Sequence, residues 1–372
     1  MGSSGTSAAV RLWSCRELAN RWRSLLVLGL LAGLVGGRAL GAAAGARRTA
    51  SAYQRFRSAT GVSDAIVFAT QVGLFDADYT AVRALPEVVP SSGRLGVTVE
   101  GCGLPAGIPV SGMAGDQQAA LFGQACFEPG MTKNTYGTGS FVLMNVGAEP
   151  PEPVEGLLGT VAWQLADGTV TYALEGAIFV TGAAVQWLRD GLGIIDHAAQ
   201  IGPLAASVDD SDGVFVVPAF TGLGSPWWDP YARGTIVGLS RGIGRAQLAR
   251  AVVEAMAHQP RDAVDAMTAA SGRVVTCLRA DGGAAAMDLL LQLQADQLQV
   301  PVSRPTVAET TALGAACLAG LAEGVWASLD EVAGRWSLET EFLPRQAKST
   351  ADAGHARWLR AVARSRAWEP AT

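Results

Sequence analysis

Asp116 and Gln117 are the residues whose types and setting best suit chemistry on an alcohol. They follow a short apolar segment, residues 108–114, and precede an apolar run typical of a helix. A carboxylate at the carboxyl end of a strand, directly before a helix, lies where open α/β sheets bind their ligands. There Asp116 would accept a proton from a hydroxyl group that Gln117 binds, and we expect both to face a crevice. Taken alone, a Gly-Asp pair before a helix is more often an N-cap.

Two glycine-containing turns have the composition of phosphate-binding loops. Gly137 and Gly139 flank Thr138, and such a turn lets N–H groups and a hydroxyl converge on an anion; a β-hairpin turn explains the spacing equally well. Gly282 and Gly283 stand between an expected strand and an expected helix, an order that brings a helix N-terminus to a nucleotide. The alternative there is a tight strand-to-helix turn, because the G-x-G-x-x-G and G-x-x-x-x-G-K-[ST] spacings are both missing.

The elements that must position these residues alternate between short β-rich and longer helical segments from about residue 85 onward, which predicts an α/β protein. The longest expected helix, 245–270, has apolar residues at three- and four-residue spacing and contains Pro260, which should kink or break it. The expected strands are 108–111, 141–146, 169–173, 214–218, 274–280 and 300–302, and the expected helices are 117–123, 182–190, 245–270, 285–298 and 312–322.

The composition excludes several classes of protein. The chain has 372 residues, of which 49% are hydrophobic and 16% charged, which indicates a globular protein with a large core. The net charge is −5, yet the first 60 residues contain nine Arg and one Glu. The remainder is therefore acidic and has no basic stripe, so we expect no nucleic-acid partner. Five scattered cysteines and three histidines predict neither a disulfide framework nor a zinc site, and they fit the reducing cytoplasm.

The N-terminal segment, residues 1–75, differs from the rest. Its apolar run, residues 24–37, would span about 21 Å as a helix, against ~30 Å for the hydrocarbon core of a bilayer, so we expect no stable membrane span. Arginines before the run and small residues at 42–44 resemble a secretory signal. The interpretation that we favour is an Arg/Ala/Gly-rich stretch produced by a GC-rich coding sequence and a wrongly assigned start. On that interpretation residues 1–75 belong to no packed domain.

A fourth pattern carries a family resemblance. Residues 234–239 and 247–254, GTIVGL and QLARAVVE, resemble the second signature of the FGGY carbohydrate kinases. Within that family the chain is most similar to the glycerol kinases, a resemblance that extends over about residues 85–369. The segments that carry this similarity, in the same order as in those kinases, are 107–125, 133–147, 175–192, 217–234 and 310–324.

The resemblance implies both a fold and an activity. The fold would be α/β, the actin-like or sugar-kinase (ribonuclease H-like) ATPase fold. The activity would be transfer of the ATP γ-phosphate to glycerol, giving ADP and sn-glycerol 3-phosphate in glycerol catabolism, with ATP and Mg²⁺ as cofactors. By resemblance, Asp116 is the catalytic base beside Mg²⁺ and also contacts glycerol, as Gln117 and Phe141 do. The residues that the resemblance assigns to nucleotide binding are Thr138, Gly182, Gln186 and Gly283.

The resemblance covers mainly the second of the family's two domains. An Asp-x-Gly-Thr-[Thr/Ser] phosphate loop opens the first domain of these kinases, and residues 1–84 do not contain one. We expect residues 76–125 to be a remnant of that first domain and residues 126–372 to be the C-terminal domain. Two functions stay open: a glycerol kinase with weak or no turnover, and a non-catalytic protein that binds nucleotides or a partner. Either could form a homo-oligomer.

Overall fold

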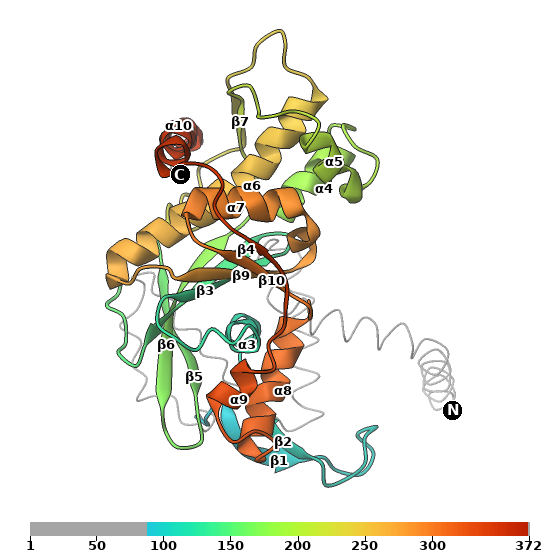
Figure 1. The fold of residues 1–372 in the computed structure, drawn as a ribbon, viewed down its shortest axis with the longest axis vertical. Coiled ribbons are helices and arrows are strands. Elements are labelled where there is room, and N and C mark those ends of the chain that lie inside the picture. The colour runs from blue at the N-terminus through green and yellow to red at the C-terminus, as the bar shows by residue number, and fades with distance from the viewer. Residues whose placement is uncertain (1–87, 371–372) are drawn as a thin grey trace, which may run out of the picture. The chain divides into compact units, whose positions relative to one another are not determined.

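The structure is a computed structural model that describes residues 88–370 (Figure 1). The expectations for residues 1–75, and those for 76–87, lie outside the described residues. A seven-stranded sheet forms the centre of this unit, in the order β11-β10-β9-β3-β4-β6-β5. Its strands are β3 (Met131–Tyr136), β4 (Ser140–Gly147), β5 (Leu158–Gln164), β6 (Val170–Ile178), β9 (Cys277–Asp281), β10 (Val302–Pro305) and β11 (Leu338–Phe342).

The strand directions determine where the loops gather. β9 pairs in parallel with both β3 and β10, whereas β4 pairs antiparallel with both β3 and β6. β3, β6, β9 and β10 therefore point the same way, and the loops that follow their carboxyl ends emerge at one edge of the sheet. Sheets of this kind bind ligands at that edge.

Helices cover both faces of the sheet (Figure 1). On one face lie α6 (Arg245–Ser271) and α7 (Asp288–Leu298), and on the other lie α3 (Asp116–Gly123) and α8 (Thr310–Ala322). The remaining elements are α4 (Gly182–Asp190), α5 (Ile201–Ala205), α9 (Leu329–Ala333), α10 (Lys348–Ser365), the short 3₁₀ helices at Ala198–Gln200 and Gly283–Ala286, the hairpin of β1 (Ser92–Val97) and β2 (Pro109–Gly112), and the pair β7 (Phe215–Val217) and β8 (Thr235–Val237).

The alternation of side chains along β4 builds two separate cores. Leu143 packs toward α3 in a cluster with Phe122 and Trp163, whereas Val142 and Met144 pack toward α6, because successive side chains of a strand point to opposite faces. On the α3 side two helices approach each other closely. A Cβ at either Gly123 or Gly314 would collide with the backbone of the facing helix, so glycine is required at both positions.

The observed elements confirm the expected α/β class and correct an expectation about Pro260. α4 has the expected bounds. The sequence predicts a kink or a break at Pro260, and because α6 runs unbroken through Pro260, the expectation of a break is wrong. Pro260 lies in the longest buried stretch of α6, from Ala255 to Val264, where packing on both sides compensates for the missing backbone hydrogen bond. No helix within residues 88–370 is both long enough and apolar enough to cross a bilayer.

Residues from Val88 onward form one compact unit. α3, which lies in the segment 76–125, packs extensively against α8. The compact unit thus includes residues on both sides of the expected boundary at residue 125. That residues 76–125 are a remnant of a first domain stays a prediction.

Candidate active site

The loops after β3, β6 and β9 line one pocket of about 860 Å³, a size typical of small-molecule sites. Its other walls come from the first residues of α7 and from the region around α5. All four residues that the resemblance assigns to nucleotide binding line this pocket, although they come from three separate segments: the turn after β3, helix α4 and the loop after β9. They are Thr138, Gly182, Gln186 and Gly283.

The turn around Thr138 is a tight hairpin between β3 and β4, as the simpler interpretation of its glycines predicts. Gly137 N donates to Gly139 O over 2.8 Å. The turn is also fastened to the start of α4, because Thr181 N and Ala183 N donate to Thr138 O over 2.8 and 3.0 Å. The backbone of the turn is thereby held rigidly at the pocket wall, while the contact of Thr138 with phosphate stays a prediction.

The Gly-Gly pair after β9 forms a strand-to-helix turn at the same pocket. Gly282 has a φ of +86°, and a Cβ there would lie 2.5 Å from the carbonyl oxygen of Tyr136, so the loop passes directly over the end of β3. Gly283 begins the 3₁₀ helix that leads to α7. The wall beyond it is largely apolar and includes Ile201 and Met287. A flat apolar ring fits such a wall better than a charged group does.

Asp116 is the first residue of α3. The N-cap is Gly115, which has no side chain to accept a capping hydrogen bond. The interpretation of Asp116 as an N-cap is therefore wrong. Its Oδ1 accepts a hydrogen bond from Gln117 N over 2.9 Å, and Gln117 Nε2 lies 3.4 Å from Oδ2. The side chain is exposed and Asp116 is not among the residues that line the pocket, so the expected crevice around it stays a prediction.

Lys133, on β3, is the functional candidate that sequence reasoning missed. It is fully buried, and its Nζ donates to Gln117 Oε1 and, over 3.0 Å, to Thr135 Oγ1. Burial lowers the pKa of Lys133, and the nearby carboxylates of Asp281, Glu175 and Asp116 oppose that shift. A buried ammonium thus holds the amide that neighbours Asp116. Its one sequence signal is rarity, since the chain contains two lysines in all.

Glu175, on β6, forms with Lys133 a row of charged side chains across the sheet, and sequence reasoning missed it too. The register pairs Glu175 with Leu143 and Leu143 with Lys133, so both charged side chains lie on the α3 face of the sheet. Burial raises the pKa of Glu175, and Lys133 opposes the shift. Phe141, half-buried and opposite Thr135 in the register, lies on the same face. Asp116, Gln117 and Phe141 are thus arranged around the β3–β4 hairpin.

Asp281 has a structural part at the end of β9. It is 3% exposed, and its Oδ2 accepts hydrogen bonds from Gln124 Nε2 over 2.7 Å and from Thr310 Oγ1 over 2.6 Å. These bonds join the end of α3 and the start of α8 to the strand that carries Gly282 and Gly283. Between residues 88 and 370 no three His, Cys, Asp or Glu side chains gather closely enough to hold a metal ion by themselves.

Comparisons with known proteins agree on one family. The model for the C-terminal domain of the FGGY family of carbohydrate kinases matches residues 132–323. The glycerol kinase of Aromatoleum aromaticum is 57% identical over 284 residues, which are 76% of this chain and 57% of that protein. Glycerol kinase 2 of Thermotoga maritima is 55% identical over 285 residues, 77% of this chain and 57% of that protein. The chain thus spans somewhat more than half the length of these relatives.

Solved structures show the same likeness. The crystal structure of Plasmodium falciparum glycerol kinase with ADP superposes with a TM-score of 0.71 at 32% identity, covering 75% of this chain and 56% of that one. Xylulose kinase from Rhodospirillum rubrum gives a TM-score of 0.64 at 27% identity, covering 76% and 57%. The described residues therefore have the actin-like ATPase fold of the sugar kinases. The chain belongs to the FGGY family of carbohydrate kinases.

Proposed function

We propose that this chain acts in the ATP-dependent phosphorylation of glycerol to sn-glycerol 3-phosphate, with Asp116 as the general base. Membership of the FGGY family and identity above 50% to glycerol kinases support this proposal. The observation that carries it is the link between two subsites. Lys133 reaches from β3 to Gln117, and β3 continues within a few residues to Thr138 in the pocket.

The reaction needs few protein groups, because phosphoryl transfer depends mostly on positioning and charge stabilisation. A glycerol hydroxyl oxygen attacks the γ-phosphorus, the bond to the β-phosphate oxygen breaks, and ADP leaves. The Asp116 carboxylate accepts the hydroxyl proton, which its exposed position at the start of α3 permits. Gln117 would bind a second hydroxyl, and Phe141 would lie against the carbon skeleton.

Nucleotide binding falls to the pocket at the sheet edge. The rigid turn around Thr138 and the loop at Gly283 would bind phosphate groups, and Gly182 and Gln186 would contact the rest of the nucleotide. Mg²⁺ is commonly bound through one or two carboxylates together with substrate phosphates, and the single exposed carboxylate of Asp116 fits that donor set. The ion would neutralise phosphate charge when bound, and Asp116 is the residue that would hold it.

A second candidate function is nucleotide binding without turnover. It is favoured by the contrast between the two subsites, since nineteen described residues line the nucleotide pocket while Asp116 stays exposed. An open acceptor site would position glycerol poorly, and lost positioning slows such reactions strongly. The chain would then serve as a nucleotide-responsive binding protein.

One experiment separates these functions. Purified chain is incubated with MgATP and glycerol, glycerol 3-phosphate is quantified, and ADP affinity is measured in parallel for wild type and Asp116→Asn. Turnover that Asp116→Asn abolishes, with ADP affinity unchanged, supports the kinase. ADP binding without turnover in either protein supports the binding function. Absence of ADP binding contradicts both.

A further inference from the structure

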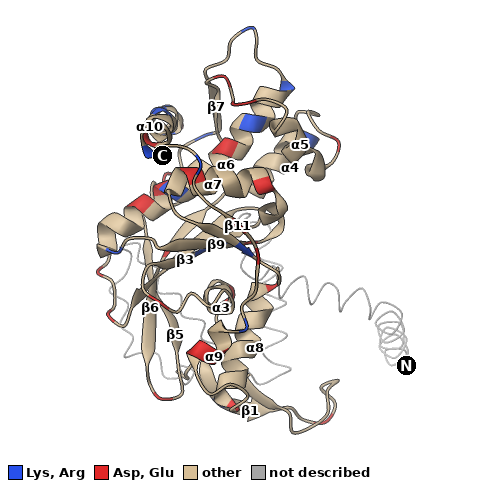
Figure 2. Ribbon diagram, in the orientation of Figure 1, with Lys and Arg blue, Asp and Glu red and all other residues tan. Residues whose placement is uncertain are grey.

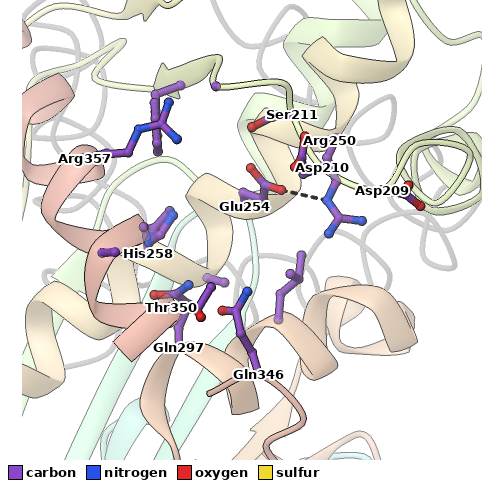
Figure 3. Close-up of a pocket in the computed structure, with 16 residues that line it drawn as sticks. Asp209, Asp210, Ser211, Arg250, Glu254, His258, Gln297, Gln346, Thr350 and Arg357 are labelled. Atoms are coloured by element: carbon purple, nitrogen blue, oxygen red, sulfur yellow. Dashed lines mark hydrogen bonds and ion pairs between the residues drawn. The ribbon is translucent and has the colours of Figure 1, made fainter. Parts of the chain in front are cut away.

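A second cavity lies between α6, α7, α10 and the segment that precedes β7 (Figure 3). Its volume is about 420 Å³, which suits a small molecule. None of its lining residues lines the nucleotide pocket. Its polar lining includes Asp209, Asp210, Arg250, Glu254, His258 and Arg357.

One side of the cavity carries positive charge that no described carboxylate neutralises. Arg357, on α10, lies over the ring of Phe215, 5.2 Å from its centroid. It also lines a neighbouring hollow with Arg360 and Arg364, and no acidic residue lines that hollow. Figure 2 colours the basic residues of the described chain blue, those of α10 among them. Like charges three and four residues apart on a helix repel one another, so an anion bound beside Arg357 would stabilise this side.

The opposite side is neutral to acidic. Arg250 Nε donates to Glu254 Oε1 over 2.8 Å, and the side chains are 11% and 17% exposed. Asp209 and Asp210 line the cavity near this pair, and Figure 3 shows them on the side away from Arg357. Carboxylates there would repel a second anionic group and would accept hydrogen bonds from hydroxyls.

His258 forms a fixed part of the cavity wall. It is 5% exposed, and its Nδ1 is buried with no hydrogen-bond partner in the described part of the chain. Its ring stacks on Trp358 with centroids 5.2 Å apart, which fixes its orientation. The Nδ1 atom itself is buried, so His258 contributes a fixed ring to the cavity wall and not a free nitrogen.

We propose that this cavity binds a small hydroxylated anion, with its carboxylate or phosphate group at Arg357 and its hydroxyls toward Glu254 and Asp210. The volume suits a six-carbon acid or a sugar monophosphate. The inference stands independently of the proposed kinase activity, because the two sites share no residue.

Three probes test this proposal by calorimetric titration of the full chain. Gluconate and glucose 6-phosphate each join hydroxyls to an anionic group, and sorbitol presents the hydroxyls of gluconate without the charge. We expect at least one anion to bind and sorbitol to give no signal. Preference between the two anions tells a carboxylate site from a phosphate site. Failure of both anions to bind overturns the proposal.

Three variants locate the binding. Arg357→Gln removes an exposed charge, and we expect at least a tenfold loss of affinity, as for a lost charge-assisted hydrogen bond. Gly354→Leu fills the cavity instead, since a Cβ at Gly354 would meet no atom within 4 Å, and it should abolish binding. Arg335→Gln removes an equal charge outside the cavity, near the end of α9, and should change nothing. Binding that survives both cavity variants places the ligand elsewhere and refutes the proposal.

Discussion

The buried ammonium of Lys133 donates a hydrogen bond to the amide oxygen of Gln117, the residue next to Asp116. The bond crosses from the middle of the sheet to the first turn of α3 and orients the Gln117 amide, so that its nitrogen is directed toward Asp116 Oδ2. The position of the proposed base thus depends on a charge that lies beneath it in the core. A buried charge is stable only while its partners remain.

Replacing Lys133 therefore tests how much the acceptor site depends on that charge. Lys133→Met should lower the free energy of unfolding by roughly 3–5 kcal/mol, because removing one member of a buried charged group leaves the others uncompensated. Burial raises the pKa of Glu175 and Lys133 opposes that rise, so the variant should lose more stability at pH 8 than at pH 5, because the carboxylate that it leaves unpaired is more ionised at the higher pH. Urea unfolding at both pH values measures this.

The matched controls use the other lysine and the partner carboxylate. Lys348, whose side chain is 71% exposed, should tolerate Met with a change of about 0.5 kcal/mol or less. The double variant Lys133→Met with Glu175→Gln should recover part of the loss. Equal effects at positions 133 and 348 would contradict the structural dependence that we describe.

Two glycines of the nucleotide pocket should respond differently to alanine. A Cβ at Gly182 would lie 2.6 Å from Gly137 O, whereas a Cβ at Gly283 would meet no atom within 4 Å. Gly182→Ala must displace the turn and should cost roughly 1–3 kcal/mol of stability, as overpacked sites do, together with affinity for ADP. Gly283→Ala should lower affinity for ADP alone. Thermal unfolding measures the stability of each variant, and titration with a fluorescent ADP analogue measures its affinity. Wild-type stability and affinity in both variants would contradict this prediction.

The sequence was most informative where local chemistry decides the structure. The order strand, Gly-Asp and helix predicted the position of Asp116 at the start of α3, and the helix expected at residues 182–190 matches α4 in both bounds. Both depend on neighbours within one or two turns of the chain. The pairing of Thr138 with Gly283 in one pocket required more than local pattern, and the family resemblance supplied it.

The sequence failed where tertiary burial reverses local preference. β3 was not predicted, because Thr132, Lys133 and Asn134 are polar, yet all three are fully buried in the central sheet. No local pattern distinguishes a buried lysine from an exposed one, so the charged row under α3 was missed with it. α10 was also missed, although its buried residues, among them Ala351, His355, Trp358 and Val362, recur at helical spacing.

Glu323 fastens the β1–β2 hairpin to the end of α8, and this contact should depend on pH. Hydrogen bonds from Arg94 and Ser111 lower the pKa of Glu323 to about 2. A carboxyl with a lowered folded pKa contributes above its ordinary value near 4.5 and loses that contribution as the pH falls toward 2. Protection of the β1 and β2 amides from hydrogen exchange should therefore decrease over that range, while β3 and β4 stay protected.

Glu323→Gln should produce the same loosening of the hairpin at pH 7. Glu100→Gln removes an equal charge from an exposed position in the β1–β2 connection and should leave the exchange rates as they are. If the hairpin amides exchange equally in wild type and Glu323→Gln, the anchor is not formed by this carboxylate.

His258 should make the whole unit less stable in mild acid. Burial, followed by the charges of His355 and Arg261, lowers the pKa of His258 to about 3. The unfolded chain binds a proton at this residue near pH 6.5, whereas the folded chain does not, so the contribution is complete above pH 6.5 and is lost as the pH falls from 6.5 toward 3. The free energy of unfolding should fall by up to about 1.4 kcal/mol per pH unit from this group. Urea titrations at pH 7, 6 and 5 give the dependence of the free energy of unfolding on pH. We expect His258→Asn to reduce this dependence and His197→Asn, at an exposed position, to leave it unchanged. An unchanged dependence in His258→Asn would assign the acid sensitivity to other groups.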